Sequence, residues 1–288
     1  MVLLNTATKV YSGSVAAKSV YLGATKVWSS GAAWDVDTQN YLTATGLNVS
    51  YAPALDGLVV GLKSKGLWTK MNAIYAFVGG TAALHKWNLK DPRDLDAAFR
   101  LTYVGGIHTT NLGYQPNPTG SYETGGYANT YLIPSTALTL NSTHLSLYSL
   151  GARAWAPRCD MGAYNWDGTQ NRFHVIAYYT AGEFYYSMAS RATPNTPAGS
   201  SLGLFVATRT SATDMAAYRN GALAASIVDA STELPYVSIN IGNINGYTRE
   251  YSDLPFGFAS IGSGLTAQNV ADLYSVIQAY QTALGRQV

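Results

Sequence analysis

The hydrophobic and polar positions from residue 100 onward form short runs, and this pattern predicts a β-rich domain. The runs are rich in β-branched and aromatic side chains, and Gly, Pro, Asn and Asp separate them at intervals of roughly ten residues. Such spacing is typical of an antiparallel sandwich. The expected strands are Tyr131–Ile133, Leu138–Leu140, Leu145–Tyr148, Met161–Tyr164, Phe173–Tyr179, Glu183–Met188, Leu204–Thr208, Met215–Arg219 and Tyr236–Ile241.

Two segments give the clearest local signals. In Gly203–Gly221, a strand, a polar turn and a second strand are followed by Asn220-Gly221, a pair that tolerates positive φ and favours a hairpin. Near the end of the chain, Thr266 can cap a helix, and Gly285 lies where a left-handed residue would end it. The apolar positions at helical spacing between them are Val270, Leu273, Tyr274, Ile277, Tyr280 and Leu284.

Clean alternation in two of the expected strands predicts a sheet with two different faces. Leu138–Leu140 and His144–Tyr148 place apolar and polar residues on alternate sides. We therefore expect one face of this sheet to be solvated or covered by a partner.

The region before residue 100 has a different pattern. Gly31–Ala54 is small and polar, and it indicates a linker or an extended strand. The apolar spacing between Leu55 and Val78 fits two short amphipathic helices broken at Gly66. The second of these stretches, from Asn72 to Val78, fits a buried strand equally well, and periodicity does not decide between the two.

The first thirty residues contain an internal repeat. Ala7–Ser12 recurs as Ala24–Ser29, 17 residues later, and each copy is a short β-branched strand that ends in an aromatic residue and a serine. Strands this short cannot bury their aromatic side chains alone. They must pack on the domain behind them, as a small β-meander, or on another protein.

Composition limits the classes of function. Charged residues make up 12% of the chain and the net charge is +2, which is too little basic charge to indicate a nucleic-acid partner. The 28 Gly and 22 Tyr indicate a surface of hydroxyls, amides and rings, which suits a subunit partly covered by its own copies, as in a homo-oligomer, or by a larger particle. No window is apolar for long enough to insert into a membrane, and the first residues do not resemble a signal peptide. The single Cys159 excludes an intrachain disulfide, as expected for folding in a reducing cytoplasm.

The residues that catalysis would need do not occur together in the sequence. A glycosidase requires two carboxylates about 5–10 Å apart, and none of the four glutamates has an acidic neighbour two positions away. The histidines and the cysteine lack metal-ligand spacing, so we expect no catalytic residues, no metal and no cofactor. Asp160, Asn165 and Asp167 could bind calcium, but a turn would use the same residues without an ion.

One segment, Arg153–Arg172, combines aromatic rings with planar polar groups, as sugar-binding sites do. The candidate carbohydrate-binding residues are Trp155, Tyr164, Asn165, Trp166 and Asp167. A tryptophan in a sandwich can equally belong to the core, and Trp-Asp-Gly also suits an ordinary hairpin turn.

The hairpin segment Gly203–Gly221 and the segment of the C-terminal helix resemble parts of the concanavalin A-like (laminin-G-like) jelly-roll domains of tailed-phage and prophage virion proteins. The matching residues are Gly203–Thr210, Ser211-Ala212, Tyr218–Gly221, Ile261–Thr266, Leu273-Tyr274, Ile277-Gln278 and Tyr280–Arg286, with weaker matches at Leu62-Lys63, Gly66–Trp68, Asn88–Lys90 and Gly113-Tyr114. The resemblance implies a mainly β fold, an antiparallel jelly-roll sandwich with a C-terminal α-helix and a small N-terminal β-arm. The expected divisions are an arm over 1–31, a linker and short helical or mixed segment over 32–99, and the sandwich with its closing helix over 100–288.

The resemblance also implies a function. It indicates a non-enzymatic structural protein of a phage virion, made in the host cytoplasm and displayed as a tail-fibre, baseplate or head-surface component. The arm would contact other virion proteins through Val10, Tyr11, Val20, Tyr21, Val27 and Trp28. The sandwich would bind a host surface glycan. Alternatively the chain is an assembly or decoration subunit without a glycan ligand, and the missing carboxylates disfavour a polysaccharide depolymerase.

Overall fold

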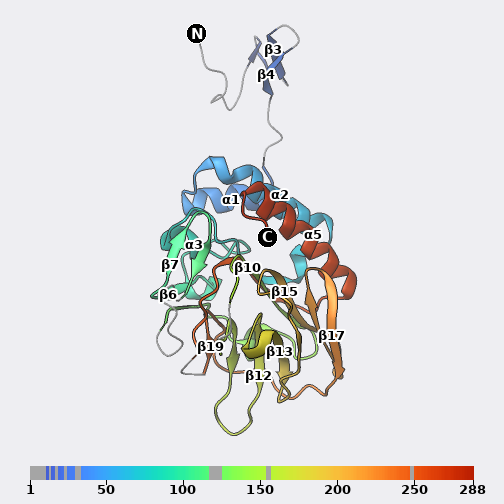
Figure 1. Ribbon diagram of the computed structural model, residues 1–288. Helices are drawn as coiled ribbons and strands as arrows, with labels where there is room; N and C mark the ends of the chain where they lie inside the picture. Colours follow the sequence, from blue (N-terminus) through green and yellow to red (C-terminus); the bar gives the residue numbers. More distant parts are fainter. Residues whose placement is uncertain are drawn as a thin grey trace.

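A computed structural model describes residues 34–116, 125–153, 157–246 and 250–288, together with the backbone of short strands between Tyr11 and Ser29. Its main body consists of two eight-stranded sheets packed face to face, with a layer of helices on the outside of one of them (Figure 1). Among the described residues, the named strands pair antiparallel except for β19 with β11, and the isolated bridge between Cys159 and Tyr251 is also parallel. The expected mainly β sandwich with a C-terminal helix is confirmed.

The first sheet, here called the covered sheet, lies beneath the helices. Its order is β17 (Ala222–Val228), β16 (Asp214–Arg219), β15 (Gly203–Arg209), β10 (Thr143–Ser149), β20 (Phe256–Gly262), β8 (Gly113–Gln115) and β7 (Ile107–Thr109), and β5 (Met71–Tyr75) also pairs with β20. Asn220 and Gly221, with φ of 49° and 81°, form the predicted hairpin turn between β16 and β17.

The second sheet, here called the open sheet, has no α-helix packed over its outer face in the described part of the chain (Figure 1). Its order is β14 (Asn195–Pro197), β13 (Glu183–Ser190), β12 (Arg172–Ile176), β11 (Met161–Tyr164), β18 (Asn240–Ile241), β9 (Tyr127–Asn129) and β6 (Thr102–Val104), and β19 (Ile244–Asn245) also pairs with β11. The strand expected at Tyr131–Ile133 does not form, and the one at Leu138–Leu140 is reduced to a bridge between Thr139 and Ser142.

The core between the sheets follows the strand alternation. Leu145 and Leu147 of β10 point into it from the covered sheet, and Phe173 and Val175 of β12 point into it from the open sheet. Each of these side chains is fully buried. Residues at the intervening positions face outward, so each sheet presents a second surface that something must cover or solvate.

Helix α1 (Val36–Thr45) occupies the segment predicted as a linker or extended strand, so that prediction is wrong. The Asp35 carboxylate accepts a hydrogen bond from the Asp37 N–H at the start of the helix, and Gly46, with φ of 64°, ends it. Only Thr38 and Tyr41 of the helix are buried. Its apolar stripe is therefore too narrow to recognise by periodicity.

The segment Leu55–Val78 forms one α-helix and one strand, rather than two α-helices. The first predicted helix is α2 (Ala52–Ser64), and the second stretch is strand β5, which pairs with β20. Alternate residues of β5 serve two cores, because Ala73 and Tyr75 face the sandwich interior whereas Ile74 faces the helices. Shorter helical segments are η2 (Val49–Tyr51), η3 (Trp68–Lys70), α3 (Ala82–His85), η4 (Asp96–Ala98), α4 (Pro134–Ala137) and η5 (Thr180–Gly182).

Helix α5 (Ala267–Ala283) confirms the predicted C-terminal helix. Thr266 and Asn269 form a reciprocal capping box at its start, and Gly285 has a left-handed φ of 68° after its end. Leu273 and Ile277 are fully buried against α2 and the covered sheet. The helix therefore belongs to the folded core.

The outer face of β10 is neither solvated nor covered by a partner, contrary to the expectation from its alternation. His144, Ser146 and Tyr148 are all fully buried on this face, beneath the chain's own helices. The polar groups satisfy one another: the His144 Nδ1–H donates to the Ser263 carbonyl at 2.6 Å, and Nε2 lies 3.0 Å from the Ser260 hydroxyl. Internal hydrogen bonds thus replace the solvent that the pattern predicted.

In the N-terminal arm, β1 (Tyr11–Ser12) pairs with β2 (Val15–Ala16), and β3 (Ser19–Leu22) pairs with β4 (Thr25–Ser29). Of the predicted anchor residues, Val10 lies outside the described residues, and only the backbone of the other five is described. The anchor role and the division at residues 31 and 99 stay predictions.

Candidate ligand-binding groove

The outer face of the open sheet carries a row of large polar and aromatic side chains. Because side chains alternate along a strand, Arg172, His174 and Ile176 of β12 share this face. Tyr164 of β11 lies opposite Arg172, and Tyr185 of β13 lies opposite Ile176. Three neighbouring strands therefore supply one continuous surface.

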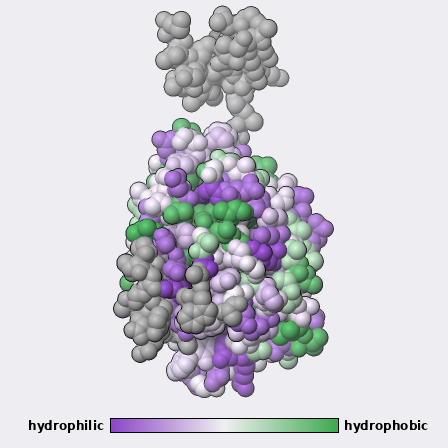
Figure 2. All heavy atoms as spheres, in the orientation of Figure 1, coloured by the Kyte–Doolittle hydropathy of each residue, from purple (hydrophilic) through white to green (hydrophobic). Residues whose placement is uncertain are grey.

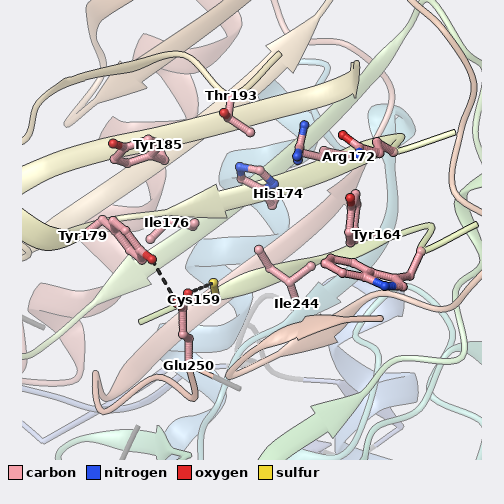
Figure 3. A pocket seen from close by; sticks show the side chains of 12 residues that line it. Cys159, Tyr164, Arg172, His174, Ile176, Tyr179, Tyr185, Thr193, Ile244 and Glu250 are labelled. Carbon is pink, nitrogen blue, oxygen red and sulfur yellow. Dashed lines mark hydrogen bonds between the residues drawn. The ribbon is translucent and has the colours of Figure 1, made fainter. Parts of the chain in front are cut away.

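This surface is hollowed into a groove of about 400 Å³ (Figure 3). Gly162 is one cause of the hollow: it lies opposite His174, and a Cβ at this position would come within 2.6 Å of the His174 Cβ. The groove is lined by Cys159, Tyr164, Trp166, Gln170, Arg172, His174, Ile176, Tyr179, Tyr185, Thr193, Ile244 and Glu250. Its size is within the range of small-ligand pockets.

One end of the groove is built around the hairpin that joins β11 to β12. The Tyr164 and Trp166 rings meet edge to face with centroids 5.1 Å apart, and Trp166 is 70% exposed. The Arg172 guanidinium lies 5.2 Å from the Tyr164 ring centroid. This end therefore offers an exposed ring next to a positive charge.

The other end combines two tyrosines with a carboxylate (Figure 3). The Tyr179 hydroxyl donates to Glu250 Oε1 at 3.0 Å, and the Cys159 thiol donates to Oε2 at 3.3 Å. The Tyr179 and Tyr185 rings pack edge to face with centroids 5.3 Å apart. Burial, and then the nearby Glu250, hold the pKa of Cys159 well above its usual range, so the thiol stays protonated.

His174 lies at the floor of the groove between these two ends. Burial lowers its pKa to about 3, and the neighbouring positive charge of Arg172 acts in the same direction. The imidazole is therefore neutral at physiological pH. Its Nε2 has no hydrogen-bond partner among the described residues.

The predicted sugar-binding residues separate into two groups. Tyr164 and Trp166 line the groove, and the exposure of Trp166 excludes it from the core. Asn165 is buried and accepts a hydrogen bond from the Tyr236 N–H at 3.1 Å, whereas Asp167 accepts from the Thr169 N–H at 3.0 Å within the hairpin turn. Trp155 lies outside the described residues. The sugar-binding role itself stays a prediction.

Sequence reasoning did not identify most of the groove. Arg172, His174 and Ile176 have period-two spacing, which could have grouped them on one strand face. Tyr185 reaches this surface through the pairing of β13 with the preceding strand β12, and Glu250 lies next to the bridge between Tyr251 and the distant Cys159, so no single segment contains both signals.

The candidate calcium ligands do not form a common site. Asp160 is fully buried, and its carboxylate accepts hydrogen bonds from Arg153 Nη2 and the Ser252 hydroxyl, each at 2.6 Å. Asn165 and Asp167 bind the separate partners described above. Over the described ranges, no three His, Cys, Asp or Glu side chains come together as a metal site would require. In the same ranges, no helix has the length and apolar character needed to cross a membrane.

Comparisons with known proteins give similarities of fold only. No family model and no curated protein matches the chain. Among solved structures, domain 4 of an extracellular GH43 arabinanase from Geobacillus stearothermophilus, in complex with arabinotriose, has a TM-score of 0.42 and 15% identity, and the match covers 71% of this chain and 98% of that one. A Trypanosoma rangeli sialidase has a TM-score of 0.49 and 8% identity, with 77% and 39% covered. The botulinum neurotoxin serotype G binding domain has a TM-score of 0.45 and 10% identity, with 72% and 51% covered.

Proposed function

We propose that this protein binds a glycan in the groove of the open sheet and does not cleave it. The observation that carries this proposal is the groove itself, in which rings and planar polar groups from three adjacent strands line one hollow. Aromatic rings pack against the C–H faces of sugars, and guanidinium, amide and carboxylate groups bond to sugar hydroxyls. Both kinds of group are present, at each end of the groove.

The number of carboxylates in the groove supports the proposal that the glycan is not cleaved. Glycoside hydrolysis commonly uses two carboxylates on opposite sides of the scissile bond. Glu250 is the only one among the described lining residues, and both of its oxygens already accept hydrogen bonds. A binding function needs no second acid.

We further propose that the chain is a structural protein of a tailed-phage virion, with its N-terminal arm bound to other virion proteins. The sequence resemblance supports this role. Its residues fall mainly on β15, the β16–β17 hairpin, β20 and α5, which all belong to the covered side of the sandwich. The groove lies outside them. A scaffold shared with other virion domains would thus present a binding surface specific to this chain.

Glycan binding can be tested with purified protein and intact host cells or their isolated polysaccharide. Trp166→Ala should weaken binding about 5- to 150-fold, if the ring contributes roughly 1–3 kcal/mol, as aromatic rings that stack on a ligand do at other sites. Trp34→Ala, which removes a partly exposed tryptophan outside the groove, is the matched control and should bind normally. Equal binding by wild type and Trp166→Ala would contradict the proposed site.

A second function, assembly without a glycan, is favoured by the edge of the covered sheet. Strand β17 is the last strand of that sheet, it carries no charged residue, and Leu223 and Val228 are 58% and 85% exposed. Figure 2 shows apolar atoms on the lower right side of the molecule, where Figure 1 draws β17. An uncharged edge strand is a ready template for pairing with another chain.

Leu223→Lys tests this second function. If β17 is a contact between copies or with another virion protein, the charge should reduce oligomer size or incorporation into particles. If the variant assembles normally and the groove binds no glycan, both functions are wrong.

A further inference from the structure

The groove contains a cation that has no acidic partner among the described residues. One guanidinium N–H of Arg172 donates to the Arg191 carbonyl, and the group lies over the Tyr164 ring, but no described carboxylate comes within ion-pair distance of it. Some buried arginines of this chain do meet a carboxylate, whereas the buried Arg286 donates only to carbonyls and to the Gln281 side chain among the described residues. Arg153 meets Asp160 at 2.6 Å, and Arg209 meets Asp229 at 3.2 Å.

Arg172 is also the only positive charge among the described lining residues. The single other basic side chain there is His174, which is neutral because burial lowers its pKa to about 3. His174 lies two residues along the same strand, and its Nε2 lacks a hydrogen-bond partner in the described part of the chain. The Arg172 guanidinium thus lacks a carboxylate partner, and the neighbouring His174 Nε2 lacks a hydrogen-bond partner, among the described residues.

The negative charge of the groove lies at the opposite end. Glu250 accepts hydrogen bonds from Tyr179 and Cys159, and Figure 3 shows this group far along the groove from Arg172. The groove is therefore polarised, with a cation at the Trp166 end and a hydrogen-bonded acid at the Tyr179 end. A ligand that fits it carries an acidic group at one end and neutral hydroxyls at the other.

We propose that the ligand is an acidic glycan whose sugar carboxylate is bound by Arg172. This inference rests on the proposed glycan-binding function and names the class of sugar. The planar fork of a guanidinium matches a carboxylate, and the stacking on Tyr164 fixes its orientation before the ligand arrives. The sugar ring that carries the carboxylate packs on Trp166, the exposed ring that meets Tyr164 edge to face. A neutral sugar would instead bury the Arg172 charge without a counter-charge, at a cost in desolvation.

The experiment compares polymers that differ only at the carboxylate. Polygalacturonate, alginate and hyaluronate are each titrated with the protein in native form and after reduction of the carboxylates to alcohols. Neutral dextran and mannan, and dextran sulfate, complete the panel. The variants are Arg172→Gln, Arg172→Lys and Arg93→Gln, the last of which removes the same charge from an exposed loop outside the groove. Thermal melting of each variant verifies that it is folded.

The wild type should bind at least one acidic polymer about 10- to 100-fold more tightly than its reduced form, as one charge-assisted hydrogen-bonded pair provides. Arg172→Gln should lose this preference, Arg172→Lys should keep part of it, and Arg93→Gln should keep all of it. Equal binding of the acidic and reduced forms, or a preference that survives Arg172→Gln, would overturn the inference. So would tighter binding of dextran sulfate than of every carboxylate polymer.

The two proposals fail in distinguishable ways. Binding of neutral polymers alone would overturn the acidic ligand and leave the glycan-binding function standing. Binding of no polymer by the folded wild type, together with no binding to host cells, would remove both.

Discussion

The two outer faces of the sandwich are built by the same alternation but end in different states. On the covered sheet, the outward residues Leu204, Val206 and Phe258 are apolar and lie beneath α2 and α5. On the open sheet, the outward residues include Arg172, His174 and Tyr185, and no α-helix of the described ranges lies on them. The covered face is a second hydrophobic core, whereas the open face keeps polar groups and a hollow.

The covered face contributes to the stability of the fold, whereas the open face is available for binding a ligand. Burying apolar surface stabilises the covered face in proportion to its area, by about 25 cal/mol per Å². The open face lacks most of that contribution. Cys159, Tyr164, Ile176 and Ile244 form only a small buried cluster there. An exposed side chain such as Trp166 can change with little effect on folding, as a binding surface requires.

A charge placed beneath the helices should have the largest effect on stability. Leu273→Asp or Ile277→Asp would put a carboxylate into the apolar contact between α5 and α2, and should lower the free energy of unfolding by roughly 3–5 kcal/mol. Urea denaturation measures this loss. Ser275→Asp, at an exposed position of the same helix, is the control and should change little. An unchanged melting temperature in the buried variants would show that the helix does not belong to the core.

Arg286 should be the next most important residue of the covered side. Its guanidinium is buried and donates to the Gln281 side chain at 2.6 Å and to the carbonyls of Phe77 and Gly257 at 2.9 and 3.0 Å. Arg286→Met would fill similar space and remove the donors to Gln281 Oε1 and the Phe77 carbonyl, while the Gly257 carbonyl would keep the Gln281 Nε2–H, so it should cost roughly 3 kcal/mol. Arg93→Met, at an exposed position, should cost almost nothing. Equal melting temperatures of the two variants would contradict this account of the C-terminus.

Acid should destabilise both faces through their histidines. Burial lowers the pKa of His174 to about 3 and that of His144 to about 4, and His85 and His108 shift in the same direction. In the unfolded chain these histidines take up protons near pH 6.5, whereas in the folded chain they stay neutral to lower pH. The free energy of unfolding should therefore be constant above pH 7 and fall as the pH drops from about 6.5 toward 4. Each pKa unit of difference is equivalent to about 1.4 kcal/mol.

Unfolding by urea at pH 7.5, 6.0, 5.0 and 4.5 measures this decline. His174→Gln should remove the contribution of the open face and leave that of His144 beneath the helices. A free energy of unfolding that stays level from pH 7.5 to 4.5 would show that these imidazoles protonate without cost.

Substitution in the groove should have the smallest effect on stability. Trp166 is 70% exposed, so Trp166→Ala should change the free energy of unfolding by no more than about 0.5 kcal/mol while weakening glycan binding. Differential scanning calorimetry on the variant measures the first quantity. A loss of several kcal/mol would mean that the hairpin of the open face is part of the folding core.

Local sequence signals predicted the covered side well where they were strong. Asn220-Gly221 indicated its hairpin, and Thr266 with the apolar spacing up to Leu284 indicated α5. Helix α1 was missed because only Thr38 and Tyr41 of it are buried. The burial of His144 was missed because a polar side chain is expected to face water unless its partner is known. That partner, Ser260, is 116 positions away in the chain.

The open side was also predictable only in part, because some of its contacts join residues that are far apart in the chain. Tyr164 and Trp166 belong to one segment, whose mixture of rings and planar groups is visible in the sequence. Tyr185 and Glu250 join them through strand pairing and through the bridge between Cys159 and Tyr251. No local pattern records such contacts. The sequence therefore identified only one segment of a site to which three strands contribute.

The central claim is that the open face, and not the covered face or the edge strand, is the binding surface. Amide and indole chemical-shift mapping tests it most directly, during titration of labelled protein with the polymer fragment that binds in the panel above. If the ligand binds in the groove, shifts are expected at Tyr164, Trp166, Arg172 and Tyr185, and none along α2, α5 or β17. Shifts clustered on β17 or on the helices, with the groove unchanged, would contradict it.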